Sequence, residues 1–146
     1  MSTLTLFTPA GVLASATPLR RAARRLAAHG FEVRVDEAAL ARHQRFAGDD
    51  ATRLAALHRI AAEAPGIAFA TRGGYGLSRL LDAIDWRAIA RSVERGTHWV
   101  GQSDLTALEL GLLAHAGGVT WAGPLACGDF GGDVVDEVTE ACFVEA

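Results

Sequence analysis

The chain has 146 residues, half of them apolar, and a formal net charge of −3. This length suits one domain with a buried core, and the negative charge argues against a general nucleic-acid binder. Two cysteines are too few for a disulfide framework and suit a reducing compartment, and no apolar run reaches the roughly 18 residues of a membrane span. We therefore expect a cytoplasmic protein that binds neither nucleic acid nor membrane.

Strands and helices are predicted to alternate along the chain. The predicted strands are Thr3–Phe7, Phe31–Val35, Ile67–Ala70, a strand containing Trp99 and Val100, and Val119–Trp121, and an apolar stretch at Ala141–Val144 could form a last one. The predicted helices are residues 18–29 with a solvated arginine face, a helix from about Asp49 to Pro65, short helices at Leu77–Ile84 and Trp86–Arg91, and an apolar helix from Asp104 to about Gly117. This alternation predicts an α/β fold with a mainly parallel sheet and helices on both faces, a flavodoxin-like three-layer arrangement.

Two short motifs follow predicted strands at points where helices should begin. Arg72-Gly73-Gly74-Tyr75-Gly76 comes after the third strand, and Gly101-Gln102-Ser103-Asp104 comes at the end of the fourth. Such strand ends are where α/β sheets place their chemistry. A serine beside a glycine-rich set of backbone N–H groups provides the parts needed for acyl transfer.

Ser103 has two interpretations. As a nucleophile it would expose its hydroxyl on a sharp turn, and the backbone N–H of Asp104 at the helix start would face the oxyanion. As a structural residue it would be an ordinary N-cap, since serine is common at that position. The motif also lacks the second glycine of the usual G-x-S-x-G turn.

The segment Arg72–Gly76 holds three glycines in five positions, each at a conformational cost of about 1 kcal/mol relative to alanine in regular structure. That cost is tolerated where the backbone approaches a ligand, or where a tight turn needs positive φ. The spacing does not match a dinucleotide-binding loop. A ligand-facing loop and a plain turn with a surface arginine both remain open.

Other polar residues favour structural roles. None of the histidines has the i, i+4 partner of a metal site, the acidic stretch after Gly128 is typical of a solvated loop, and nothing near Cys127 would lower its pKa. The sequence therefore indicates no metal site. The histidines are His29, His43, His58, His98 and His115.

Several motifs in order give the chain a resemblance that runs nearly from end to end. They are Phe46-Ala47-Gly48-Asp49-Asp50 with Arg53 and Leu54, Arg72–Gly76, Leu80-Leu81 with Asp85, Gly101–Leu108, and Gly123-Pro124. The chain resembles the LD-carboxypeptidase family, cytoplasmic serine peptidases related to the microcin-immunity hydrolases.

The resemblance implies a role for each motif. Ser103 would be the nucleophile, and the backbone N–H groups of Asp104 and Gly74 would form the oxyanion hole. Arg72, Gly73 and Tyr75 would contact the substrate, a murein tetrapeptide cleaved at the L,D bond before its terminal D-alanine during cell-wall recycling. The family uses no metal or cofactor.

Two departures from the family pattern affect these expectations. The family's charge-relay Glu and His lie in a separate C-terminal domain, so residues 1–146 are expected to be the N-terminal, nucleophile-bearing domain and to be inactive alone. That domain would be a partner, and a homodimer is also conceivable. In addition, Ala122 stands where the family usually has a histidine before Gly123-Pro124.

Two other functions remain open on sequence grounds. The same serine could serve a microcin-immunity-type hydrolase that cleaves the amide of a peptidyl-nucleotide. Alternatively, the chain could be a catalytically silent module that holds a carboxylate or phosphate with the segment Arg72–Gly76.

Overall fold

A computed structural model describes all residues from Met1 to Ala146, and its strands form one fully parallel sheet. The spatial order is β2-β1-β3-β4-β5, so the chain first moves outward from β1 to β2 and then continues on the other side of β1. The loops after β1 and β3 therefore diverge at a topological switch point, where α/β sheets form their binding crevices. The strands are β1 (Thr3–Phe7), β2 (Glu32–Val35), β3 (Ile67–Ala70), β4 (His98–Gly101) and β5 (Trp121–Ala122).

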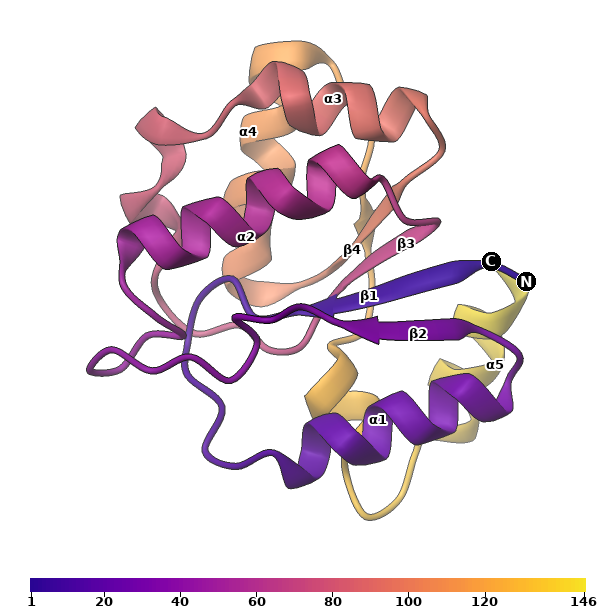
Figure 1. Cartoon of the computed structure of the whole chain (residues 1–146). Coiled ribbons are helices and arrows are strands. Elements are labelled where there is room, and N and C mark those ends of the chain that lie inside the picture. Colours follow the sequence, from indigo (N-terminus) through magenta and orange to yellow (C-terminus); the bar gives the residue numbers. More distant parts are fainter.

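Helices cover both faces of the sheet, as predicted. Figure 1 shows α2, α3 and α4 on one face and α1 and α5 on the other. The α-helices are α1 (Thr17–Ala28), α2 (Asp50–Glu63), α3 (Trp86–Glu94), α4 (Thr106–Ala116) and α5 (Glu137–Glu145). Short 3₁₀ turns form η1 (Leu77–Arg79), η2 (Leu81–Ala83) and η3 (Ser103–Leu105), and a π-helical turn forms η4 (Ala126–Phe130).

Two hydrophobic cores lie on opposite sides of the sheet, because successive strand residues point to opposite faces. Leu4 and Leu6 of β1 face α1, whereas Phe7 faces the other side and packs edge-on against Trp99, with 5.5 Å between ring centroids. Each core ties helices to the same short strands. The sheet is thereby held rigidly enough to position the loops at its carboxyl edge.

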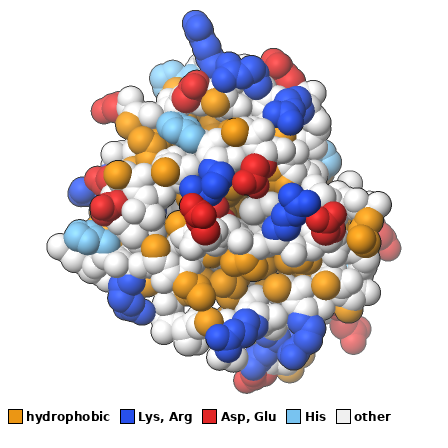
Figure 2. All heavy atoms as spheres, in the orientation of Figure 1, with side chains coloured by type: hydrophobic (Ala, Val, Ile, Leu, Met, Phe, Trp, Pro, Cys, Tyr) orange, Lys and Arg blue, Asp and Glu red, His pale blue; other side chains and the backbone are white.

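The predicted arginine face of α1 is confirmed. Leu19, Ala22 and Leu26 are buried, whereas Arg20 and Arg24 are exposed. Figure 2 shows arginine side chains gathered over α1, with arginines and acidic side chains mixed on the rest of that face. None of the helices combines the length and the apolar character needed to span a bilayer.

The interpretation of Ala141–Val144 as a strand is wrong, because this segment belongs to helix α5. Asp136 starts the helix by accepting a hydrogen bond from the Thr139 N–H at 2.8 Å. Phe143 then stacks on Phe69 under the sheet, with ring centroids 4.7 Å apart. A short apolar run does not distinguish strand from helix, and here the cap and the aromatic contact decide.

Several boundaries also differ from the prediction: β2 starts at Glu32 rather than Phe31, and α3 extends to Glu94 rather than Arg91. The fifth strand is Trp121–Ala122 rather than Val119–Trp121, and the helix expected at Leu77–Ile84 is two 3₁₀ turns. The helix expected from Asp104 begins as 3₁₀ turn η3 and becomes α-helical at Thr106. A 3₁₀ start is common at helix ends.

Candidate active site

Ser103 lies on a sharp turn directly after β4. Its φ is +62°, a left-handed conformation that few residues other than glycine adopt and that costs roughly 1–2 kcal/mol. Gln102 before it is extended, and the Ser103 side chain is exposed. Ser103 is not at an N-cap position, because Gln102 is the N-cap of η3 and Leu105 is the N-cap of α4. The N-cap interpretation is therefore wrong, and the strained turn presents a free hydroxyl.

Gly73 packs directly against this hydroxyl. A Cβ atom at Gly73 would lie 2.6 Å from Ser103 Oγ and 3.3 Å from the backbone nitrogen of Asp104. The absence of a side chain at this position is what lets the two loops meet. The structure thus brings the two sequence motifs together at the carboxyl ends of β3 and β4.

The peptide between Gly73 and Gly74 has a fixed direction. The Gly11 N–H donates to the Gly73 carbonyl at 3.1 Å, and the peptide is trans. Because C=O and N–H of a trans peptide point in opposite directions, the Gly74 N–H is directed away from Gly11. This N–H has no hydrogen-bond partner within the chain, so it is free to donate to a ligand.

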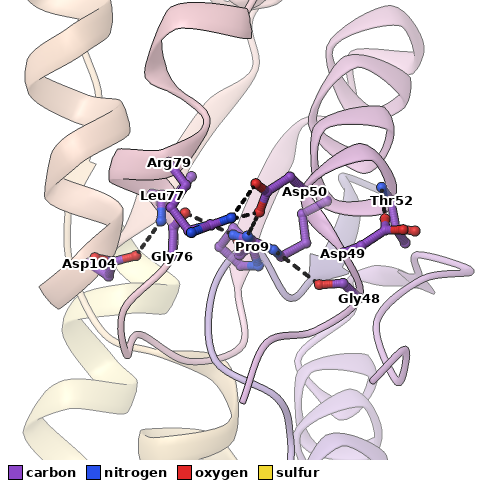
Figure 3. A network of polar contacts seen from close by, with 10 residues as sticks. Pro9, Gly48, Asp49, Asp50, Thr52, Gly76, Leu77, Arg79 and Asp104 are labelled. Atoms are coloured by element: carbon purple, nitrogen blue, oxygen red, sulfur yellow. Dashed lines mark hydrogen bonds and ion pairs between the residues drawn. The ribbon is translucent and has the colours of Figure 1, made fainter. Parts of the chain in front are cut away.

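The carboxylate of Asp104 joins the two loops. Its Oδ2 accepts a hydrogen bond from the Leu77 N–H at 2.8 Å, just after the glycine-rich segment (Figure 3). The sequence interpretation used only the backbone of Asp104. The side-chain contact adds a second link, one that fixes the loop after β3 relative to the serine.

The two larger side chains of the glycine-rich segment are exposed. Arg72 donates from Nη1 to the Val12 carbonyl at 2.8 Å, and Tyr75 lies against Phe46 with ring centroids 5.9 Å apart. Arg45 sits 5.7 Å from the centre of the tyrosine ring. An aromatic ring and cationic groups therefore border the strand ends where Ser103 is exposed.

Arg53 is a site-neighbouring residue that sequence reasoning did not single out. Its side chain is completely buried at the start of α2, and it donates hydrogen bonds to carbonyls of three different loops. Burial lowers its pKa, and nearby Asp50 opposes that change. In the sequence, Arg53 stands out only as part of the motif Phe46–Asp50 with Arg53 and Leu54, and no role is predicted for it.

The Ser103 hydroxyl is not joined by a hydrogen bond to any histidine or carboxylate of the chain, since His29 bonds to Glu140, His58 to the Asp85 N–H, and the Asp104 carboxylate to the Leu77 N–H. Burial raises the pKa of the Cys127 thiol to about 11, so this thiol is protonated at neutral pH. No group of three or more His, Cys, Asp or Glu side chains forms a metal site. Four histidines have other contacts: His29 with Glu140, His58 with the Asp85 N–H, His98 with Trp121, and His115 with Trp86.

Two cavities lie near the carboxyl edge of the sheet or along its last strands, and neither contains Ser103. A cavity of about 620 Å³ runs along β4, β5 and α5 and includes Gln102. A cavity of about 420 Å³ is lined mostly by polar residues, namely His43, Gln44, Phe46, Asp49, Asp50, Ala51 and Arg79. Ser103 lines neither of these two cavities, and its side chain is exposed.

The chain is similar to known carboxypeptidases along nearly its whole length. The LD-carboxypeptidase N-terminal domain matches residues 4–123. The chain is 33% identical over 140 residues to a Bacillus subtilis protein named probable murein peptide carboxypeptidase. Its fold superposes on the crystal structure of muramoyltetrapeptide carboxypeptidase from Oxalobacter formigenes with a TM-score of 0.86 and 31% identity.

The microcin C7 self-immunity protein MccF has the same fold, with a TM-score of 0.89 at 22% identity. The matches cover 91% of this chain for the Bacillus subtilis protein and 99% for the Oxalobacter formigenes and MccF structures. In return, the chain spans 43% of the Bacillus subtilis protein, 47% of the Oxalobacter formigenes chain and 43% of the MccF chain, about half of the length of each. The chain belongs to the LD-carboxypeptidase family.

Proposed function

We propose that residues 1–146 supply the nucleophile and the oxyanion hole of a serine LD-carboxypeptidase. The substrate would be a murein tetrapeptide, cleaved before its terminal D-alanine during cell-wall recycling. The names of the Bacillus subtilis and Oxalobacter formigenes relatives support this substrate class. The observation that carries the proposal is the contact of Gly73 with Ser103 Oγ, which puts a free hydroxyl beside unpaired backbone N–H groups.

In this mechanism Ser103 Oγ attacks the carbonyl carbon of the bond to D-alanine while a base removes its proton. The oxyanion accepts hydrogen bonds from the N–H groups of Asp104 and Gly74. The amine of D-alanine leaves with a proton, and water then hydrolyses the acyl-serine. Arg72 would hold the free carboxylate of the D-alanine, and Gly73 and Tyr75 would contact the peptide.

The base would come from outside residues 1–146. Serine is a weak nucleophile at neutral pH without a positioned base, and none of the hydrogen bonds made by histidines of this chain goes to Ser103. We therefore expect residues 1–146 alone to release no measurable D-alanine. The charge-relay Glu and His would be contributed by a C-terminal domain of the family type.

The proposal can be tested with a fusion enzyme. It joins residues 1–146 to the part of the Oxalobacter formigenes carboxypeptidase that this chain does not cover. The fusion enzyme should release D-alanine from L-Ala-γ-D-Glu-meso-diaminopimelate-D-Ala, and Ser103→Ala should lower kcat by several orders of magnitude. A folded fusion enzyme whose turnover survives Ser103→Ala would contradict the proposal.

The alternatives give different results in the same experiment. An amide hydrolase of peptidyl-nucleotides would cleave such an amide through Ser103 and leave the tetrapeptide intact. A catalytically silent module would bind tetrapeptide or phosphate through Arg72–Gly76 and release nothing. Binding without turnover, weakened by a change at Arg72 and unaffected by Ser103→Ala, would favour the silent module.

A further inference from the structure

Arg53 occupies an unusual place for a charged side chain. It lies in the first turn of α2, where arginine is ordinarily solvated, yet none of its side-chain surface is exposed. A buried guanidinium is unfavourable unless its donors are satisfied. The hydrogen-bond acceptors of the Arg53 guanidinium therefore indicate the structural role of this buried charge.

The guanidinium connects three loops at the carboxyl edge of the sheet. Nη1 donates to the carbonyls of Pro9, after β1, at 3.1 Å and of Gly76, after β3, at 2.9 Å. Nε donates to the carbonyl of Gly48, before α2, at 3.3 Å. Figure 3 shows Pro9, Gly48 and Gly76, one residue from each of these loops, within the same network of polar contacts.

Two further contacts orient the guanidinium. Nη2 donates to Asp50 Oδ1 at 2.6 Å, and Asp50 is itself held by Arg79 at 2.8 Å. The Phe46 ring lies 4.8 Å from the Arg53 Cζ atom. Asp50 thus holds the edge of the planar guanidinium by a hydrogen bond, and the Phe46 ring lies against its face.

The carbonyls that Arg53 holds flank the two segments that form the candidate site. Gly76 directly precedes Leu77, whose N–H donates to Asp104 beside the serine. Pro9 precedes Gly11, whose N–H holds the Gly73 carbonyl and so directs the Gly74 N–H. Arg53 therefore holds both of the loops whose hydrogen bonds, Leu77 to Asp104 and Gly11 to Gly73, position the proposed oxyanion hole.

Gly76 is shaped for this contact. A Cβ atom there would lie 2.6 Å from Arg53 Nη1, and its φ of +157° disfavours any side chain. The third glycine of the glycine-rich segment is thereby explained by the arginine rather than by a ligand. Gly73 faces the serine, and Gly76 faces Arg53.

We propose that Arg53 is a positioning residue, whose guanidinium holds the loops after β1 and β3 so that Gly73 and the Gly74 N–H stay against Ser103. The catalytic purpose rests on the proposed function, whereas the positioning itself is a property of this chain. Lysine cannot replace it, because one ammonium lacks the planar fork that reaches three carbonyls and a carboxylate at once.

The test uses amide hydrogen exchange by NMR on residues 1–146. Two reporter amides sense loop position: Leu77, bonded to Asp104, and Gly11, bonded to Gly73. Arg53→Lys and Arg53→Met should lower protection of both by about tenfold or more, relative to the amides of β3. Asp50→Ala removes one of the partners of the guanidinium and leaves its three carbonyl contacts, so it should cause a smaller drop at the same two amides.

Arg59→Lys is the matched control. Arg59 lies on the same helix and pairs with the buried Asp36 at 2.9 and 3.0 Å, away from the glycine-rich segment. It should change global stability without changing the relative protection of Leu77 and Gly11. Equal effects of the Arg53 and Arg59 changes on these amides would show a merely structural role and overturn the proposal.

Kinetics of the fusion enzyme supply the second readout. Arg53→Lys should lower kcat by about 10²-fold, the effect of a misplacement near 1 Å, with little change in KM. If the fusion enzyme is inactive, the exchange experiment still decides on Arg53. If it is active and Arg53→Lys leaves both kcat and loop protection unchanged, the positioning proposal fails while the proposed function stands.

Discussion

Replacing Gly73 by alanine tests the contact on which the proposed site depends. The added Cβ would lie 2.7 Å from Ser103 Cβ and 2.6 Å from its Oγ, whereas carbon atoms in contact are ordinarily about 3.5–4.0 Å apart. The serine and the glycine-rich segment must therefore separate by about 1 Å. Gly73 does not have positive φ, so the backbone itself accepts alanine and the effect is purely steric.

A 1 Å displacement at the reacting groups lowers turnover by about 10²-fold. Stability should change far less, because the exposed serine can yield and alanine reduces the entropy of the unfolded chain, leaving a net loss of about 1 kcal/mol. Gly73→Ala should thus separate activity from folding. We expect a large fall in kcat of the fusion enzyme beside a small shift of the urea midpoint.

Gly128→Ala is the control for Gly73→Ala. The same methyl group added at Gly128 has its nearest neighbour at 3.9 Å, an ordinary contact. Kinetics and urea unfolding of both variants should be compared with the unsubstituted fusion enzyme. Full turnover in Gly73→Ala would refute the idea that the bare Cα surface of Gly73 shapes the site.

Other predictions follow from the turn, the loop and the helix caps. Ser103→Gly should unfold at higher urea than Ser103→Ala, by about 1 kcal/mol in unfolding free energy, because glycine relieves the left-handed strain; equal midpoints would contradict strain at φ +62°. Arg72→Met should raise KM for the tetrapeptide about tenfold with kcat nearly unchanged, and an unchanged KM would remove Arg72 from substrate binding. The backbone hydrogen bond from Thr52 lowers the pKa of Asp49, so its stabilising effect is present at neutral pH and is lost as pH falls through that lowered pKa. Asp49→Asn, which still caps α2 without titrating, should therefore show a smaller loss of urea midpoint between about pH 6 and about pH 3.

Much of the fold follows from local patterns in the chain. The bounds of Thr3–Phe7 and Ile67–Ala70 are confirmed as β1 and β3, because short apolar runs between turn residues are typical of buried parallel strands. Asp49 caps α2, and its 2.8 Å bond to the Thr52 N–H matches the capping pattern expected there. Local interactions determine the bounds of these elements, so the bounds can be predicted from the sequence alone.

The tail could not be predicted in the same way. Ala141–Val144 is apolar enough for a strand, and its helical state depends on Phe143 stacking on Phe69, a contact between distant parts of the chain. Arg53 was missed for a related reason. An arginine on a helix ordinarily faces water, and only the folded loops reveal the carbonyls that surround it.

The sequence predicted where the candidate site lies, but it did not predict the contacts that hold the two loops together. The sequence motifs placed Ser103 and the glycine-rich segment at neighbouring strand ends, and the structure brings them into contact. Which glycine meets the serine could not be known beforehand. The Asp104 carboxylate and Arg53, which hold the loops together, are visible only once the loops have converged.

The most direct test of the central claim is covalent labelling of the fusion enzyme with a fluorophosphonate, followed by peptide mass mapping. Such a probe phosphonylates a serine that is activated by a base and faces oxyanion donors. The account predicts one adduct, on the peptide containing Ser103, that is lost in Ser103→Ala and slowed in Gly73→Ala. Turnover of the tetrapeptide with an adduct on any other residue, or with no adduct at Ser103, would contradict it.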